Sequence, residues 1–348
     1  MSRRPRKRRK SRAVSPFRRL TIIAGSAAAT IAVVAALVVA YVAWSYNGPG
    51  PEARTGEATT VLLRRGAGLA EIANALENAG VVRSASVFIT AAQVTGMSRD
   101  LKAGEYRFQS GASLARVLKA IRDGDVVRHY VTIPEGLTSE MAAEILAKNE
   151  VLTGEAPAPP EGSILPETYQ VERGEDRAAV MRRMMEARDK LLAQLWARRQ
   201  PGLPFNSPEE AVILASVVEK ETGLAAERPR VAAVFVNRLR QGMRLESDPT
   251  IIYGLTRGRP LGRGIRLSEL TTATPYNTYL ISGLPPTPIA NPGRASLAAV
   301  LDPPKSNELF FVADGSGGHV FASTFEDHKL NVARWRAAEK AAGQAKEP

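Results

Sequence analysis

Two carboxylates, Glu219 and Glu221, stand at the end of an apolar segment, where side chains could do acid–base chemistry. The segment is NSPEEAVILASVVEKETG, residues 206–223. Its residues from 211 to 218 are almost all apolar, with no polar stripe, which predicts a buried helix. A carboxylate at the end of such a helix faces the negative end of the helix dipole and apolar neighbours. Both effects raise its pKa.

A carboxylic acid that stays protonated near neutral pH is suited to donate a proton in the cleavage of a glycosidic bond. The alternative is that the Glu-Lys-Glu run only marks the point where the helix leaves the core, with its charges in water. Residues two apart lie on opposite sides of a helix, so the spacing does not choose between Glu219 and Glu221. A second acid must come from elsewhere or be unnecessary.

The ends of this helix are well defined in the sequence. Ser207 is a favourable N-cap, Pro208 fits the first helical position and Glu210 completes a capping box. Gly223 is expected to end the helix. Asp248 is expected to cap a later helix, followed by a first-position proline.

The rest of the chain predicts an α+β protein in two parts. Residues 57–129 read as a small module of short strands around helices at 69–80, 84–96 and 114–124, the last capped by Ser113. Residues 130–337 predict a larger mixed α+β domain. That domain begins with a helix capped by Thr138 or Ser139 and holds an Ala/Pro-rich loop at 154–162 and a long, mostly solvent-facing charged helix at 175–200. Residues 338–348 form a polar tail.

The N-terminal part predicts a membrane anchor. Residues 20–44 contain no charge and are long enough for a transmembrane helix, whereas the hydrophobic region of a cleaved signal peptide, the alternative, is shorter. Ten basic residues precede it within residues 1–19, which predicts a cytoplasmic tail, and residues 45–56 read as a linker. The remaining chain is expected on the far side of the membrane.

Composition narrows the class of protein. Without the basic tail the chain has 37 basic and 35 acidic residues, which argues against nucleic acid as a partner. The absence of cysteine excludes disulfides, zinc–thiolate sites and thiol catalysis. The three histidines are scattered, so no metal or cofactor is expected.

Five ordered segments carry a resemblance to a known family. They are ILPETY (164–169), ILASVVEKET (213–222), VAAVFVNRLRQGMRLESDPTIIYGL (231–255), TPYNTYLISGLPPTPIANPG (274–293) and FFVADGSGGHVFASTFEDH (310–328). Over residues 56–337 the chain resembles the endolytic murein transglycosylases, the MltG or YceG-like family. The resemblance implies that residues 57–129 form a LysM-like module and that the first Glu of the Val-Glu-Lys-Glu-Thr run, Glu219, is the catalytic acid.

The same motifs suggest further residues that bind substrate. These candidates are Glu221, Asn237, Arg238, Thr250, Tyr253, Tyr276, Asn277, Thr278, Tyr279 and His319. Aromatic faces, amides and hydroxyls suit sugar rings and N-acetyl groups. The alternatives are helix-surface residues at 237 and 238, a capped loop with buried tyrosines at 276–279, and a structural hydrogen bond for His319.

The resemblance implies a lytic transglycosylase that limits the growth of nascent peptidoglycan glycan strands. It would cleave the bond between N-acetylmuramic acid and N-acetylglucosamine and leave 1,6-anhydro ends. A hydrolase that uses water, and a membrane-tethered glycan-binding scaffold without turnover, are the alternatives. The implied location is the outer, periplasmic face of the bacterial cytoplasmic (inner) membrane, with peptidoglycan synthases, the penicillin-binding proteins, as partners. Residues 57–129 are expected to bind glycan rather than to catalyse.

Overall fold

The computed structural model describes the backbone of residues 16–344 and the side chains of residues 29–340. Most of the predicted cytoplasmic tail, and the last four residues of the predicted polar tail, therefore lie outside the described part of the chain. The chain divides into two compact units, residues 1–127 and 128–348.

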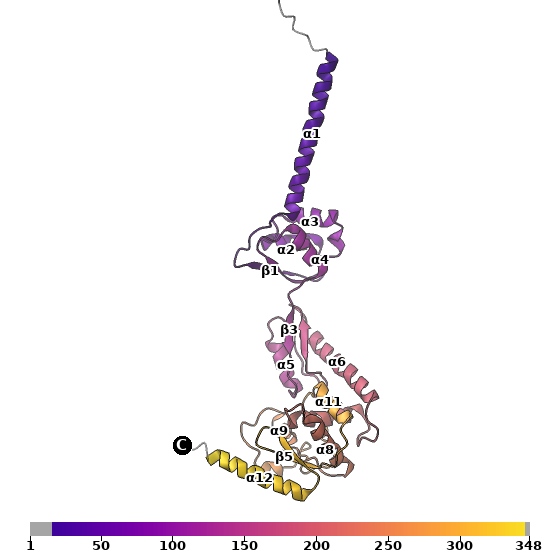
Figure 1. The fold of residues 1–348 in the computed structure, drawn as a ribbon, viewed down its shortest axis with the longest axis vertical. Coiled ribbons are helices and arrows are strands. Elements are labelled where there is room, and N and C mark those ends of the chain that lie inside the picture. The colour runs from indigo at the N-terminus through magenta and orange to yellow at the C-terminus, as the bar shows by residue number, and fades with distance from the viewer. Residues whose placement is uncertain (1–15, 345–348) are drawn as a thin grey trace, which may run out of the picture. The chain divides into compact units, whose positions relative to one another are not determined.

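The elements of both units follow one another along the chain as Figure 1 labels them. The first unit contains α1 Pro16–Asn47, β1 Ala58–Leu63, α2 Leu69–Asn78, α3 Ala85–Val94, a short 3-10 helix Met97–Arg99, β2 Gly104–Gln109 and α4 Leu114–Asp123. The second unit contains β3 His129–Thr132, α5 Ser139–Lys148, β4 Thr168–Val171, α6 Arg177–Ala197, α7 Pro208–Glu221, α8 Arg228–Arg240, α9 Asp248–Thr256, α10 Leu267–Leu270, α11 Arg294–Leu301, β5 Phe310–Ala313, β6 His319–Ala322 and α12 Phe325–Gln344.

The strands form three antiparallel two-stranded sheets within the described residues, β1–β2, β3–β4 and β5–β6. Two-stranded sheets are too small to bury a core by themselves, so the helices supply most of the apolar packing. The predicted α+β class is confirmed.

The first unit has its own core between the β1–β2 hairpin and α2, α3 and α4. Tyr106 is fully buried there, and its hydroxyl donates to the carbonyl oxygens of Lys102 at 2.8 Å and Ile121 at 3.2 Å. As predicted, the Ser113 side chain caps α4, accepting from the Arg116 amide. The predicted linker packs against the same unit, since Gly50 N–H donates to the Gly111 carbonyl at 3.1 Å.

Helix α1 begins before the predicted membrane segment and runs three residues past Trp44. Its part from Ala29 to Asn47 has a mean hydropathy of 2.0 and is long enough to cross a bilayer. These properties are compatible with a single-pass anchor.

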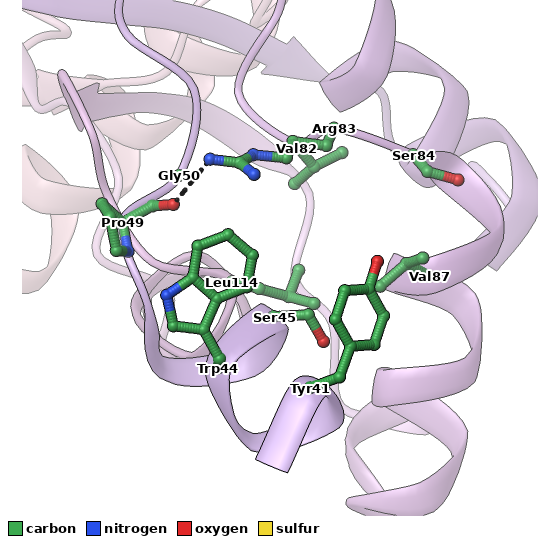
Figure 2. A pocket seen from close by; sticks show the side chains of 10 residues that line it. All are labelled: Tyr41, Trp44, Ser45, Pro49, Gly50, Val82, Arg83, Ser84, Val87 and Leu114. Atoms are coloured by element: carbon green, nitrogen blue, oxygen red, sulfur yellow. Dashed lines mark hydrogen bonds between the residues drawn. The ribbon is translucent and has the colours of Figure 1, made fainter. Parts of the chain in front are cut away.

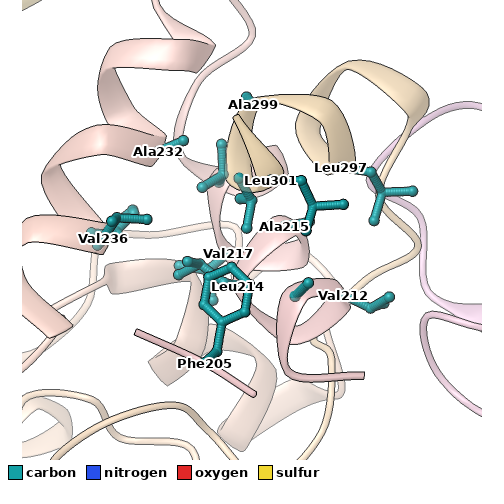
Figure 3. Close-up of a cluster of buried hydrophobic side chains, with 14 of the residues drawn as sticks. Phe205, Val212, Leu214, Ala215, Val217, Ala232, Val236, Leu297, Ala299 and Leu301 are labelled. Atoms are coloured by element: carbon teal, nitrogen blue, oxygen red, sulfur yellow. The ribbon is translucent and has the colours of Figure 1, made fainter. Parts of the chain in front are cut away.

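The second unit is organised around α7, whose central residues are buried, as predicted. Side chains of α7 pack against those of α8 and α11, with Phe205 beneath them (Figure 3). Helix α6 adds Leu191 and Leu192 to this core, while its other buried residues belong to a separate cluster with α5, β3 and β4.

The helix ends differ from the prediction in detail. Ser207 caps α7 by accepting from the Glu210 amide, but the Glu210 carboxylate accepts from Asn206 N–H rather than from the cap residue. The last helical residue is Glu221, and Gly223 directly follows the C-cap Thr222, as predicted; Thr222 is extended and its hydroxyl accepts from the Leu224 amide at 3.0 Å. The cap of α9 is Ser247, one residue before the predicted Asp248.

Asn291 ties the segment before α11 to the start of α5. Its side chain is fully buried; it donates to the Leu137 carbonyl at 3.0 Å and accepts from Ile164 N–H at 3.2 Å. The same amide group contacts Ser139 and Glu161. One side chain therefore satisfies polar groups from two segments that are distant from it in the sequence.

Asn291→Ala should destabilise the second unit. The substitution leaves the Ile164 amide and other polar groups buried without a partner, which should cost at least about 2 kcal/mol of unfolding free energy. Denaturant unfolding of the full chain measures this. Asn307→Ala, in an exposed loop of the same unit, is the matched control and should change stability by no more than about 0.5 kcal/mol. Equal effects of the two substitutions would contradict the assigned role of Asn291.

Candidate functional site

Glu219 lies where the end of α7 meets the beginning of α11. Its side chain is 5% exposed. Atom Oε2 accepts from Gly293 N–H at 2.9 Å and from the Ser296 hydroxyl at 2.7 Å. Atom Oε1 has one long contact, 3.5 Å to Nη2 of Arg228. The carboxylate thus satisfies an amide at the N-terminal end of α11, where amides lack helical partners and the helix dipole is positive.

Two glycines beside Glu219 are needed for different reasons. A Cβ on Gly293 would overlap the carboxylate of Glu135. Gly136 has φ +75°, which other residues rarely adopt, although a Cβ there would only be in ordinary contact with Glu219 Cγ at 3.5 Å. The segment Asn291-Pro-Gly therefore shapes the site through its backbone: the Gly293 amide donates to Glu219, and its missing side chain leaves space for Glu135.

Glu135 is a second carboxylate beside Glu219 that sequence reasoning missed. It lies in the loop after β3, and its Oε2 is 3.8 Å from Nη2 of Arg228. Partial burial raises the pKa of Glu135, the negative charge of Glu219 raises it further, and Arg228 opposes both. The only signal in the sequence was a carboxylate next to a turn glycine.

Arg228, at the start of α8, is the cation shared by these two carboxylates. Its side chain is 9% exposed, and its Nε is buried without a hydrogen-bond partner among the described residues. A buried guanidinium needs compensating charge, which Glu219 and Glu135 supply. Sequence reasoning missed Arg228 because it lies outside the motifs.

Glu221 points to the other side of α7, as the spacing predicted. Its Oε1 accepts a hydrogen bond from the Ser247 hydroxyl. Burial raises the pKa of Glu221 to about 7; the charge of Asp248 adds to this effect, while Ser247 and Arg238 oppose it. The predicted rise in pKa at the helix end is therefore found at Glu221.

Thr250, Asn277 and Thr278 are buried and bonded to the protein itself. The Thr278 hydroxyl accepts from Ser247 N–H at 2.9 Å and is 2.8 Å from the Thr250 hydroxyl. Asn277 donates to backbone carbonyls at the end of α10 and accepts from Tyr279 N–H at 3.0 Å. These side chains hold the loop after α10 against the start of α9. Their predicted contact with substrate stays a prediction.

The three tyrosines lie in two places. The rings of Tyr253 and Tyr276 meet edge to face with centroids 4.9 Å apart. The Tyr253 hydroxyl donates to Glu161 at 3.3 Å, and burial followed by the charge of Glu161 raises its pKa to about 12. Tyr276 is half-buried. Tyr279 instead donates to Asp248 at 2.7 Å, and burial, with that bond second, raises its pKa.

Asn237, Arg238 and His319 fasten the β5–β6 hairpin and the loop before it. Asn237 donates to the Ser306 carbonyl at 2.7 Å, and Arg238 donates to the Leu309 carbonyl at 2.7 Å. Arg238 is buried, so it is not a helix-surface residue. Nδ1 of His319 is 2.7 Å from a carboxylate oxygen of Glu227, which fixes the imidazole at the start of β6.

The predicted site residues therefore fall into separate neighbourhoods of the second unit. Glu219 lies in contact with Arg228 and Ser296 and close to Glu135. The sequence did not predict these three neighbours. The remaining candidates are grouped around Glu221, around the Tyr253–Tyr276 pair and around the hairpin.

Comparisons with known proteins agree with this architecture. The endolytic murein transglycosylase of Streptococcus pneumoniae strain D39 is 30% identical, over 81% of this chain and 59% of its own length. The chain thus spans less than two thirds of that relative. The endolytic murein transglycosylase of Bacillus subtilis is 28% identical, over 76% of this chain and 81% of its own length.

A solved structure is also similar. The 2.6 Å crystal structure of a YceG-like protein from Listeria monocytogenes matches with a TM-score of 0.50 and 27% identity, covering 79% of this chain and 99% of that one. The sequence model of the YceG-like family matches residues 61–334. Because this match takes in most of both units, with α7, Glu219 and Gly293, the chain belongs to the YceG-like family.

Proposed function

We propose that this protein is an endolytic lytic transglycosylase that cleaves the glycan strands of peptidoglycan. Family membership supports the proposal, as do the two relatives, which are named endolytic murein transglycosylases. The observation that carries it is the position of Glu219, an acid held by α11 at the end of a buried helix.

The two oxygens of Glu219 differ in what they can do. Two donors occupy Oε2, whereas Oε1 has only the long contact to Arg228. We therefore assign Oε1 as the reacting atom. It gives its proton to the glycosidic oxygen, the bond between this oxygen and C1 of N-acetylmuramic acid breaks, and N-acetylglucosamine leaves with a free 4-hydroxyl. The C6 hydroxyl then attacks C1 and returns its proton to Oε1, which produces the 1,6-anhydro end.

Arg228 and Glu135 complete this assignment. Arg228 stabilises Glu219 while it is ionised between the two proton transfers. Glu135 contacts the same guanidinium at 3.8 Å and so helps to hold Arg228 beside Oε1 of Glu219. No nucleophilic carboxylate is required, because the C6 hydroxyl of the substrate takes that role, in contrast to retaining glycosidases.

The proposal includes a location. Helix α1 spans the bacterial cytoplasmic membrane with the basic tail inside, so that both units face the cell wall. Residues 57–129 contribute glycan binding, and peptidoglycan synthases working on the same face are the proposed partners. Cutting nascent strands there would limit their elongation.

Glu219→Gln should abolish turnover without unfolding the protein. Gln keeps the size of the side chain but cannot donate and recover the proton, so the rate on purified glycan strands should fall by about 10⁴-fold. Glu221→Gln, on the opposite face of α7, is the matched control and should cost much less. Mass spectrometry of the products from the full chain should find anhydro ends.

Other results would separate the alternatives. Reducing ends in place of anhydro ends would indicate a hydrolase. Strand binding without turnover by the unmodified, folded protein would favour the scaffold. Normal turnover by Glu219→Gln would contradict the assignment of the acid.

Glu135→Gln should weaken activity less than Glu219→Gln does. The substitution removes one of the two carboxylates beside Arg228, so the guanidinium is held less firmly next to Oε1 of Glu219, and a loss of about tenfold is expected. Initial rates of the full chain on purified glycan strands measure this. An unchanged rate would contradict the role assigned to Glu135.

Glu221→Gln should change how stability depends on pH. The folded pKa of Glu221 is about 7, above the value of about 4.3 for an unfolded Glu. The folded protein keeps a proton that the unfolded chain loses, so stability should fall as pH rises through this interval. Gln removes that fall. Thermal unfolding should therefore show that the Tm of Glu221→Gln, relative to that of the unmodified protein, rises between pH 5 and pH 8. For Glu209→Gln, at an exposed position, the difference in Tm from the unmodified protein should stay constant over this range.

A further inference from the structure

An open apolar groove lies between the end of α1 and helix α3. It has a volume of about 620 Å³. The α1 side includes Val38 and Val42, and the α3 side includes Val87, Ala91 and Val94. Both sides belong to the first unit, far along the chain from the proposed acid.

Helix α3 has two apolar faces, and only one is used by the core. Ala85, Phe88 and Ala92 are buried in the unit. On the groove side, Val87 is 45% exposed and Val94 is 82% exposed. The helix ASVFITAAQV contains no charged residue. A short surface helix that is apolar on its outer side is unusual in water, because that side gains nothing from solvent.

Three hydroxyls along the groove donate to carbonyl oxygens of their own helices. Thr90 donates to the Ser86 carbonyl at 2.9 Å, and Thr95 donates to the Ala91 carbonyl at 2.7 Å. On α1, Ser45 donates to the Val42 carbonyl at 2.9 Å. Hydroxyls that donate back to the helix are the form that hydrocarbon tolerates, because no donor is left without a partner.

The junction that shapes the groove is packed rather than loose. Figure 2 shows Trp44 and Tyr41 projecting from the end of α1, with the Arg83 side chain reaching toward Pro49. The guanidinium of Arg83 is 5.4 Å from the Trp44 ring and donates to the Pro49 carbonyl at 3.2 Å. Tyr46 packs against the core of the unit. Helix α1 therefore enters the unit through ordered contacts.

We propose that this groove takes the acyl chains of membrane phospholipids, so that α3 lies in the bilayer interface beside α1. The proposal rests on the membrane span assigned to α1 under the proposed function. The occupant follows from continuity, since the valines on the α1 side belong to the very stretch that would contact lipid. Trp44 and Tyr41 mark the interface, where aromatic side chains gather.

The depths agree. Val38 lies about 9 Å from Trp44 along the helix axis, at 1.5 Å per residue. Interfacial helices bury their apolar face about 5–10 Å into the headgroup and acyl boundary. Helix α3 faces this stretch of α1, and Arg83 stands beside Trp44, where it can meet a lipid phosphate.

The chain has no cysteine, so single cysteines can report the depth of chosen positions. Val94→Cys in the full chain, labelled with a small fluorophore, is placed in nanodiscs that hold one copy each and phospholipids brominated on the acyl chains. The matched position is Leu62→Cys, on β1, which is 43% exposed and lies outside the groove. Val34→Cys reports the span itself.

Bromolipid should quench the labels at positions 34 and 94 several-fold more than the label at 62, while aqueous iodide should quench mainly the label at 62. If the label at 94 is quenched by iodide and not by bromolipid, as is expected of the label at 62, while the label at 34 is quenched by bromolipid, the groove proposal is overturned and the anchor stands. If 34 is not quenched by bromolipid, the anchor fails, and the groove proposal fails with it. A label at 94 shielded from both quenchers indicates that protein covers the groove, which also overturns the proposal.

Discussion

The carboxylate of Glu219 joins the ends of two helices, α7 and α11. It accepts from Gly293 N–H and from Ser296 in the first turn of α11, and these contacts link the negative end of one helix dipole to the positive end of the other through one carboxyl group. Both helices share one core with α8, so a shift of either would disturb the packing and this contact together. The same junction includes two glycines and the loop that carries Glu135: Gly136 lies against Glu219, and Gly293 lies against Glu135.

Two carboxylates two residues apart illustrate how strongly the surroundings decide the behaviour of a side chain. Glu219 meets three donors, two of them from α11 and one from a guanidinium. Glu221 meets a single hydroxyl inside the core, and burial raises its pKa to about 7. The helix dipole acts on both carboxylates, whereas their hydrogen-bond partners come from different segments of the fold. Position on α7 alone therefore does not decide which groups each side chain meets.

The sequence was most informative where an effect is local. The buried character of α7, the opposite directions of its two carboxylates and the caps at Ser113 and Ser207 all follow from periodicity and short-range hydrogen bonds. Glu135 and Arg228 were missed because they meet Glu219 only through folding of distant segments. The hydrogen bond from the Leu224 amide to the Thr222 hydroxyl at the end of α7 was not predicted, because it depends on the path of the chain after the helix. The stretch after Trp44 has the composition of a linker but packs through backbone groups, which composition does not report.

The unequal oxygens of Glu219 have a consequence for the chemical cycle proposed above. A free carboxylic acid can carry its proton on either oxygen, and a proton on the oxygen that does not face the substrate could not be donated to the glycosidic oxygen. Here an amide N–H and a hydroxyl both donate to Oε2, which favours Oε1 as the oxygen that carries the proton in the proposed cycle. The proton taken from one sugar hydroxyl then stands where the next leaving oxygen needs it. The proton that Glu219 recovers in one turnover would be the proton that it donates in the next, so no exchange of this proton with bulk water would be required.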